Sequence, residues 1–145
     1  MLTDYHVHLR PDGPNTTAEQ YFTAENAAEY RRQAADRGIS ELGVAEHVYR
    51  FTQALDVWDH DHWADNARDD IDAYCDFVRS ETDLKLGIEA DFIPGREERL
   101  RDLQERTGGI TEFVPLSFIP FNTLLGRTHG IEEISMRENL KHTAA

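Results

Sequence analysis

The feature that most constrains the fold is an alternation of short apolar segments with longer segments of helical composition. Four segments have the composition of strands, although two prolines weaken the last of them: residues 3–9, 39–47, 84–92 and 111–121. Three segments between them have the spacing and composition of helices: residues 16–38, 63–81 and 96–106. Strands that alternate with helices favour parallel pairing, because each helix returns the chain to the same edge of the sheet. We therefore expect an α/β fold, either an open parallel sheet or a barrel.

Local signals indicate where the first helix begins and ends and where a loop follows the second strand. Thr17 and Gln20 have the spacing of a capping box, and Gly38 stands where a glycine commonly ends a helix. Residues 48–62 are polar and aromatic without a clear period, so they are expected to form a loop.

The composition excludes several classes of function. A length of 145 residues suits one domain and is short for a complete α/β barrel. With 15 basic and 28 acidic side chains, the net charge of −13 disfavours binding to the phosphates of a nucleic acid. Cys75 is the single cysteine, so an intramolecular disulfide is excluded and a buried side chain is expected. No apolar run has membrane-spanning length and no signal-peptide pattern opens the sequence, so we expect a cytoplasmic protein without a membrane partner.

Imidazole and carboxylate side chains gather where three of the expected strands end. These are His6 and His8 on the first strand, Glu46 and His47 on the second, and Glu89 and Asp91 on the third. Side chains two residues apart on a strand point to the same face, and the carboxyl ends of parallel strands meet at one edge of the sheet. The pattern therefore predicts a cluster of these groups at that edge.

Imidazole and carboxylate ligands without a thiolate suit zinc, manganese or iron, and a bound metal ion can lower the pKa of a water molecule. Each pair also has a purely structural explanation when it is taken alone. The Glu46–His47 pair is compatible with a solvated strand end or a helix cap, and Glu89 is compatible with an ion pair to an arginine. Three such pairs in successive strands favour a metal site.

The stretches DYHVHLRPDG, GVAEHVYRF and LGIEADFIPG, in this order, resemble the first three motifs of the PHP (polymerase and histidinol phosphatase) family. The resemblance covers residues 3–108 and is closest to the histidinol-phosphatase branch. It implies a distorted (β/α)7 TIM-like barrel that binds up to three zinc, manganese or iron ions. It also implies a phosphatase that hydrolyses the small phosphorylated substrate L-histidinol phosphate in histidine biosynthesis.

Carried over position by position, the resemblance implies a role for each motif residue. His6 and His8 would bind one metal ion, His47 would bind another, and Glu89 would bridge two ions. Glu89 and His47 are thus the catalytic candidates, and Asp12 is a further candidate ligand. Two arginines just beyond strand ends, Arg10 and Arg50, are candidates for holding the substrate phosphate.

The sequence departs from the family after the third strand. The stretch FVPLSFIP lacks the histidine that the family has there, and residues 109–145 resemble none of its later motifs. We therefore expect a PHP-type metal-binding region over residues 1–108 and a divergent segment over residues 109–145, that is, the N-terminal part of a truncated barrel.

Three hypotheses about function follow from this pattern. The first is the phosphatase, with the missing ligands supplied by His129 or by another chain. The second is a truncated, non-catalytic remnant that binds metal or a partner chain, in which the open barrel edge would favour association between copies. The third is an amidohydrolase-like or nuclease activity on the same metal scaffold. A second His-x-His pair, His60 and His62, is expected to cap and solvate a loop instead of binding metal.

Overall fold

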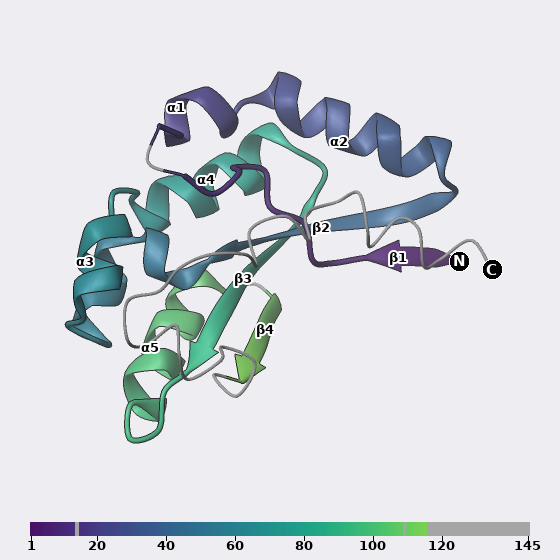
Figure 1. Cartoon of the computed structure of the whole chain (residues 1–145). Helices are drawn as coiled ribbons and strands as arrows, with labels where there is room; N and C mark the ends of the chain where they lie inside the picture. Colours follow the sequence, from purple (N-terminus) through teal and green to yellow (C-terminus); the bar gives the residue numbers. More distant parts are fainter. Residues whose placement is uncertain (14, 109, 116–145) are drawn as a thin grey trace.

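Four parallel strands form the sheet of this protein, in the order β1-β2-β3-β4 (Figure 1). The computed structural model describes residues 1–13, 15–108 and 110–115. The strands are β1 (Leu2–Asp4), β2 (Ile39–His47), β3 (Lys85–Phe92) and β4 (Ile110–Pro115). The helices are α1 (Ala18–Tyr21), α2 (Ala24–Asp36), α3 (Asp61–Asn66), α4 (Ile71–Glu81) and α5 (Glu97–Thr107), with 3-10 turns η1 (Val48–Arg50) and η2 (Thr52–Asp56).

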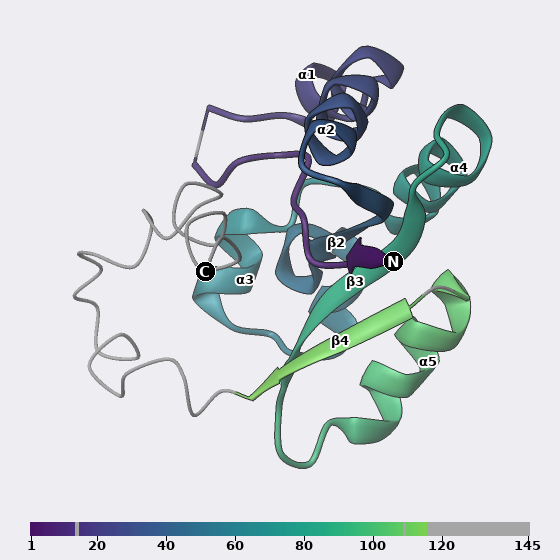
Figure 2. The same cartoon turned by 90° about the vertical axis from the view of Figure 1, so that its right-hand side faces the viewer.

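Helices pack against the sheet and bury its apolar side. Figure 2 shows α4 and α5 on the same side of β3. Val44 of β2 and Ile88 of β3 are almost fully buried there, together with Tyr74 of α4 and Leu100 of α5. Burial of such side chains is the main favourable contribution to folding. The strands are parallel and helices connect them, while closure into a (β/α)7 barrel stays a prediction.

The second strand has the bounds that its sequence predicts, but the first strand is shorter. Strand β1 ends at Asp4 instead of residue 9, and His6 N–H donates to the Asp4 carboxylate at 3.0 Å instead of to a neighbouring strand. One backbone hydrogen bond, from Ala45 N–H to Val7 O, still joins the following segment to β2. The histidines of the His-x-His motif therefore lie on an irregular segment beside β2.

Two predicted helices are each interrupted. Thr23 begins α2 as a new N-cap, because its hydroxyl accepts from Asn26 N–H at 3.2 Å. Asp70 likewise begins α4, since its carboxylate accepts from Ala73 N–H. The predicted loop at 48–62 is wrong in part, because it contains η1, η2 and the start of α3. Short polar side chains that compete for backbone N–H groups account for both new caps.

Three local expectations are confirmed: the capping contact of Gln20, the glycine after the first long helix, and the burial of Cys75. The Gln20 side chain accepts from Thr17 N–H, and Gly38 follows α2 with a φ of 76°, which a glycine adopts without strain. Cys75 is buried and not in a disulfide. Within the described residues, no helix is long and apolar enough to cross a membrane. Residues 116–121 of the predicted fourth strand lie outside the described residues, as does His129.

Candidate metal centre

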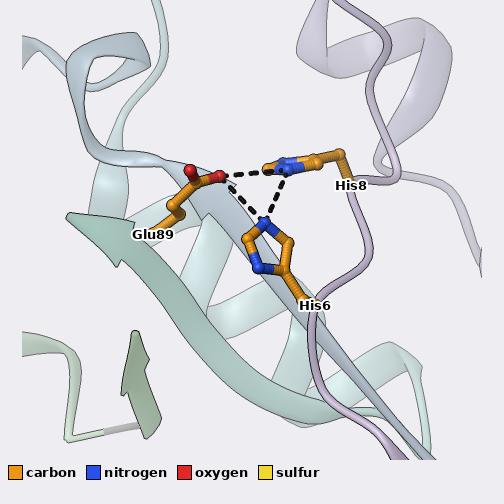
Figure 3. Close-up of side chains that lie close together, drawn as sticks. All are labelled: His6, His8 and Glu89. Carbon is orange, nitrogen blue, oxygen red and sulfur yellow. Dashed lines mark hydrogen bonds and ion pairs between the residues drawn. The ribbon is translucent and has the colours of Figure 1, made fainter. Parts of the chain in front are cut away.

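Three side chains converge at the carboxyl end of the sheet (Figure 3). His6 Nε2 lies 3.0 Å from Glu89 Oε2, and His8 Nε2 lies 3.1 Å from the same oxygen. The two imidazole nitrogens are 3.2 Å apart. Three donor atoms from two distant parts of the chain thus point at one small volume.

The parallel register of the sheet brings a third imidazole to the same carboxylate. His47, the last residue of β2, is paired with Glu89 of β3, and its Nδ1 lies 3.0 Å from Glu89 Oε2. The imidazole of His47 stacks on that of His8, with ring centroids 4.3 Å apart. Glu89 is therefore surrounded by the imidazoles of both sequence motifs.

The surroundings of Glu89 favour its charged form. Burial by itself raises the pKa of this carboxyl, but hydrogen bonds from His47, His6 and His8 outweigh it and hold the pKa well below its usual range. Asp91 lies two residues further along the same strand, and burial raises its pKa. The centre thus holds one firmly ionised carboxylate among three imidazoles.

Asp12 lies on the far side of His47 from this cluster. Its Oδ2 is 3.8 Å from His47 Nε2, and its Oδ1 accepts hydrogen bonds from Tyr49 and Arg50. Burial raises the pKa of Asp12, but the contacts with Arg50 outweigh it and the net effect is to lower the pKa. Asp12 therefore adjoins His47 and does not meet His6, His8 and Glu89 directly.

The two candidate phosphate-binding arginines are buried in ion pairs. Arg10 is 6% exposed and lies 2.7 Å from Asp69 Oδ2, while Arg50 is 2% exposed and pairs with Glu46 and Asp12. Both guanidinium groups already form ion pairs with carboxylates of the protein. The arrangement supports a structural role for these arginines and places neither of them free at the surface.

Glu46 does not join the cluster at the carboxyl ends of the strands, where the sequence predicts it. Adjacent residues of a strand point to opposite faces, so His47 faces the cluster while Glu46 faces the other side and is fully buried. Glu46 and His47 thus lie in different environments, one inside the core and one in the cluster, and the sequence pattern alone did not distinguish them.

The second His-x-His pair has the structural role that was expected of it. His60 is the N-cap of α3, and its Nδ1 accepts from His62 N–H at 3.1 Å. Among the described residues, the group whose ligand atoms all lie close together is formed by His6, His8 and Glu89.

The geometry of the cluster fits a metal ion of the kind that the sequence implies. Ligands roughly 2.0–2.1 Å from a tetrahedral zinc ion are about 3.3 Å from one another, close to the separations of 3.0, 3.1 and 3.2 Å between the three donor atoms. In addition, His8 Nδ1 is buried without a hydrogen-bond partner, which is the nitrogen left over when Nε2 binds a metal. The residues present therefore suit zinc, manganese or iron.

Comparison with known proteins finds short similar segments in curated proteins. No family model matches the chain, and no solved structure matches it. A protein of Methanosarcina acetivorans named 5-amino-6-(D-ribitylamino)uracil--L-tyrosine 4-hydroxyphenyl transferase 1 is 43% identical over an alignment of 56 residues, and the match covers 28% of this chain and 15% of the relative. The protein of the same name from Methanosarcina mazei is 41% identical over an alignment of 46 residues, and the match covers 26% of this chain and 12% of the relative. The transferase of Haloarcula marismortui is 68% identical over 28 residues, or 19% of this chain and 6% of the relative.

These names contradict the predicted reaction. The relatives are named as transferases, so the predicted hydrolysis of L-histidinol phosphate and the assignment to histidine biosynthesis are wrong. The physical reason for the error is that imidazole and carboxylate ligands specify a metal and not the bond that reacts. The chain spans no more than 15% of the length of these relatives. The longest of the three matches runs over 56 residues, whereas His6 and Glu89 are 83 positions apart, so no single match contains the whole cluster.

Proposed function

We propose that this chain is a metal-binding protein that holds a divalent transition-metal ion between His6, His8 and Glu89. The observation that carries the proposal is the convergence of three donor atoms within 3.2 Å of one another. A divalent cation placed between these three donor atoms would accept a lone pair from each of them. The proposal retains the metal and barrel features of the PHP resemblance and leaves out its reaction.

His47 extends the proposed site toward a second ion. It contacts Glu89 from β2, so Glu89 would bridge two ions if both were bound, and Asp12 would lie beside the second ion. The resemblance allows for up to three zinc, manganese or iron ions. A metal ion held there would supply a positive centre that binds water or a substrate oxygen and lowers the pKa of that water.

Metal analysis of matched variants tests the proposal. The purified chain, freed of any affinity tag, is analysed by elemental mass spectrometry and then titrated with Zn²⁺ after chelation. We expect at least one ion per wild-type chain and loss of one ion in His8→Ala, because that variant removes a donor from the cluster. His62→Ala is the matched control, since His62 belongs to the other His-x-His pair and is expected to keep the full metal content.

Two results would contradict the proposed site. A wild-type chain that takes up no metal would refute metal binding altogether. Full metal content in His8→Ala, together with loss of an ion in His62→Ala, would place the site at the other His-x-His pair.

A second candidate function is the transferase activity for which the relatives are named. The observation that favours it is the 68% identity over 28 residues with the Haloarcula marismortui protein. Its test is binding of 5-amino-6-(D-ribitylamino)uracil or L-tyrosine to the purified chain, measured by calorimetry with and without Zn²⁺. Saturable binding of either compound would support this function, and no heat at millimolar ligand would exclude it for this chain.

Association between copies completes the proposal. The described sheet is bounded by β1 and β4, and an open strand edge can pair with another chain. We expect a homo-oligomer in the cytoplasm without a nucleic-acid or membrane partner. Light scattering after size-exclusion chromatography measures the mass, and a strictly monomeric chain at all concentrations would refute this part.

A further inference from the structure

A fully buried carboxylate, Glu46, lies directly behind the candidate metal centre. Its Oε1 accepts from Leu9 N–H at 2.7 Å and from Arg10 N–H at 3.2 Å. Its Oε2 pairs with Arg50, whose guanidinium also donates to Arg10 O. Glu46 therefore fastens to β2 the two residues that immediately follow His8.

The same carboxylate faces the unused nitrogen of His8. His8 presents Nε2 to Glu89, while its Nδ1 is buried without a hydrogen-bond partner and lies 4.0 Å from Glu46 Oε2. An imidazole that binds a metal through one nitrogen carries its proton on the other, and that proton needs an acceptor. A carboxylate offers about four lone-pair positions, so Glu46 retains capacity beyond its contact with Arg50.

We propose that Glu46 is a positioning residue of the metal centre. It holds the backbone after His8, and it accepts a hydrogen bond from His8 Nδ1–H when the ring turns by the small amount that closes the 4.0 Å gap. His8 then presents Nε2 to the metal in one tautomer and one orientation. This inference rests on the proposed function, because it needs the ion that His8 would bind.

Asp69 provides the matched comparison for Glu46. It is also a buried carboxylate, 6% exposed, and it pairs with an arginine of the same segment, Arg10. Among the interactions of the described residues, its partner is a guanidinium and not an imidazole. A purely structural role for Glu46 predicts that Glu46→Gln and Asp69→Asn behave alike, whereas the positioning role predicts that only Glu46→Gln alters metal binding.

The decisive experiment measures Co²⁺ and Zn²⁺ binding to wild type, Glu46→Gln and Asp69→Asn. Loss of a carboxylate that orients a metal-binding histidine typically lowers metal affinity by about 10- to 100-fold, and we expect this for Glu46→Gln. We also expect the visible absorption of the Co²⁺ form at saturation to change in Glu46→Gln and to stay that of the wild type in Asp69→Asn. Equal affinity and an unchanged spectrum in Glu46→Gln would overturn the inference.

A measurement on the wild-type chain covers the case in which Glu46→Gln does not fold. Long-range ¹H–¹⁵N correlation spectra of the Zn²⁺ form report which nitrogen of His8 carries the proton. The inference requires Nδ1–H and is overturned by a proton on Nε2. A wild-type chain that binds neither ion refutes the proposed function itself, which separates that failure from a failure of the role of Glu46 alone.

Discussion

Replacing Arg50 by methionine tests whether the ion pair between Arg50 and Glu46, behind the metal centre, is buried. The side chain of Arg50 is 2% exposed and that of its partner Glu46 is 0% exposed. Methionine keeps an unbranched apolar chain of similar length but removes the guanidinium. The variant therefore leaves the buried Glu46 carboxylate without the guanidinium that pairs with it.

The expected loss follows from that uncompensated charge. Removing one partner of a buried ion pair costs about 3–5 kcal/mol, against a total stability of about 5–15 kcal/mol for a domain. With a urea dependence of about 2 kcal/mol per molar, the unfolding midpoint of Arg50→Met should fall by about 1.5–2.5 M. Neutralising the stranded carboxylate should restore part of this, so the double variant Glu46→Gln, Arg50→Met should be more stable than Arg50→Met alone.

Urea unfolding of the metal-free chain at pH 7, followed by far-ultraviolet circular dichroism, measures both effects. Arg32→Met is the control, because Arg32 makes its ion pairs at 61% exposure and its loss should leave the midpoint almost unchanged. A loss below about 1 kcal/mol in Arg50→Met would match a solvated pair and refute the reasoning. A double variant less stable than Arg50→Met would also refute it.

Three further predictions concern the supporting structure. Asp70→Ala should lower the free energy of unfolding by about 1 kcal/mol in urea at pH 7, because it removes the N-cap of α4. Hydrogen bonds from Ala73 N–H and Gln53 lower the pKa of Asp70 in the folded chain, so the difference in stability from wild type should shrink as the pH falls below 3.8. A constant difference down to pH 2 would contradict this. Tyr74→Phe should lower the free energy of unfolding by about 1 kcal/mol in the same measurement, because the buried hydroxyl donates to Gly87 O at 2.8 Å. An unchanged unfolding midpoint would contradict a stabilising role for this hydrogen bond. The thiol of Cys75, whose pKa is raised by burial, should react with a disulfide reagent only after urea unfolds the chain, so rapid reaction in the native state would contradict its burial.

Elements with strong local signals could be predicted from the sequence. Strand β2 has the predicted bounds, and α5 (Glu97–Thr107) lies within one residue of the predicted helix at 96–106. Gly38 precedes β2, and Gly95 and Gly108 flank α5, so local signals mark these boundaries. The predicted extents of the strand at 3–9 and of the helix at 63–81 were wrong. In the strand, His6 N–H donates to the Asp4 side chain instead of to a neighbouring strand, and in the helix a backbone group outside the segment takes the N–H groups. Arg68 and Asp69 N–H groups, for example, donate to Arg50 O and so interrupt the predicted helix.

The sequence by itself determined which motifs meet. His6 and His8 both reach Glu89 from the segment that follows β1, and the parallel pairing of β2 with β3 places His47 beside Glu89. Only the tertiary structure decided which of the neighbouring charged side chains belong to the metal centre and which support it from behind. Adjacent side chains of a strand face opposite sides, so the sequence did not say which of Glu46 and His47 faces the metal centre. The tertiary structure buries Glu46 against the residues that follow His8 and leaves His47 in the cluster. Arg50, 2% exposed between Glu46 and Asp12, was likewise assigned to the support by contacts that no local pattern encodes.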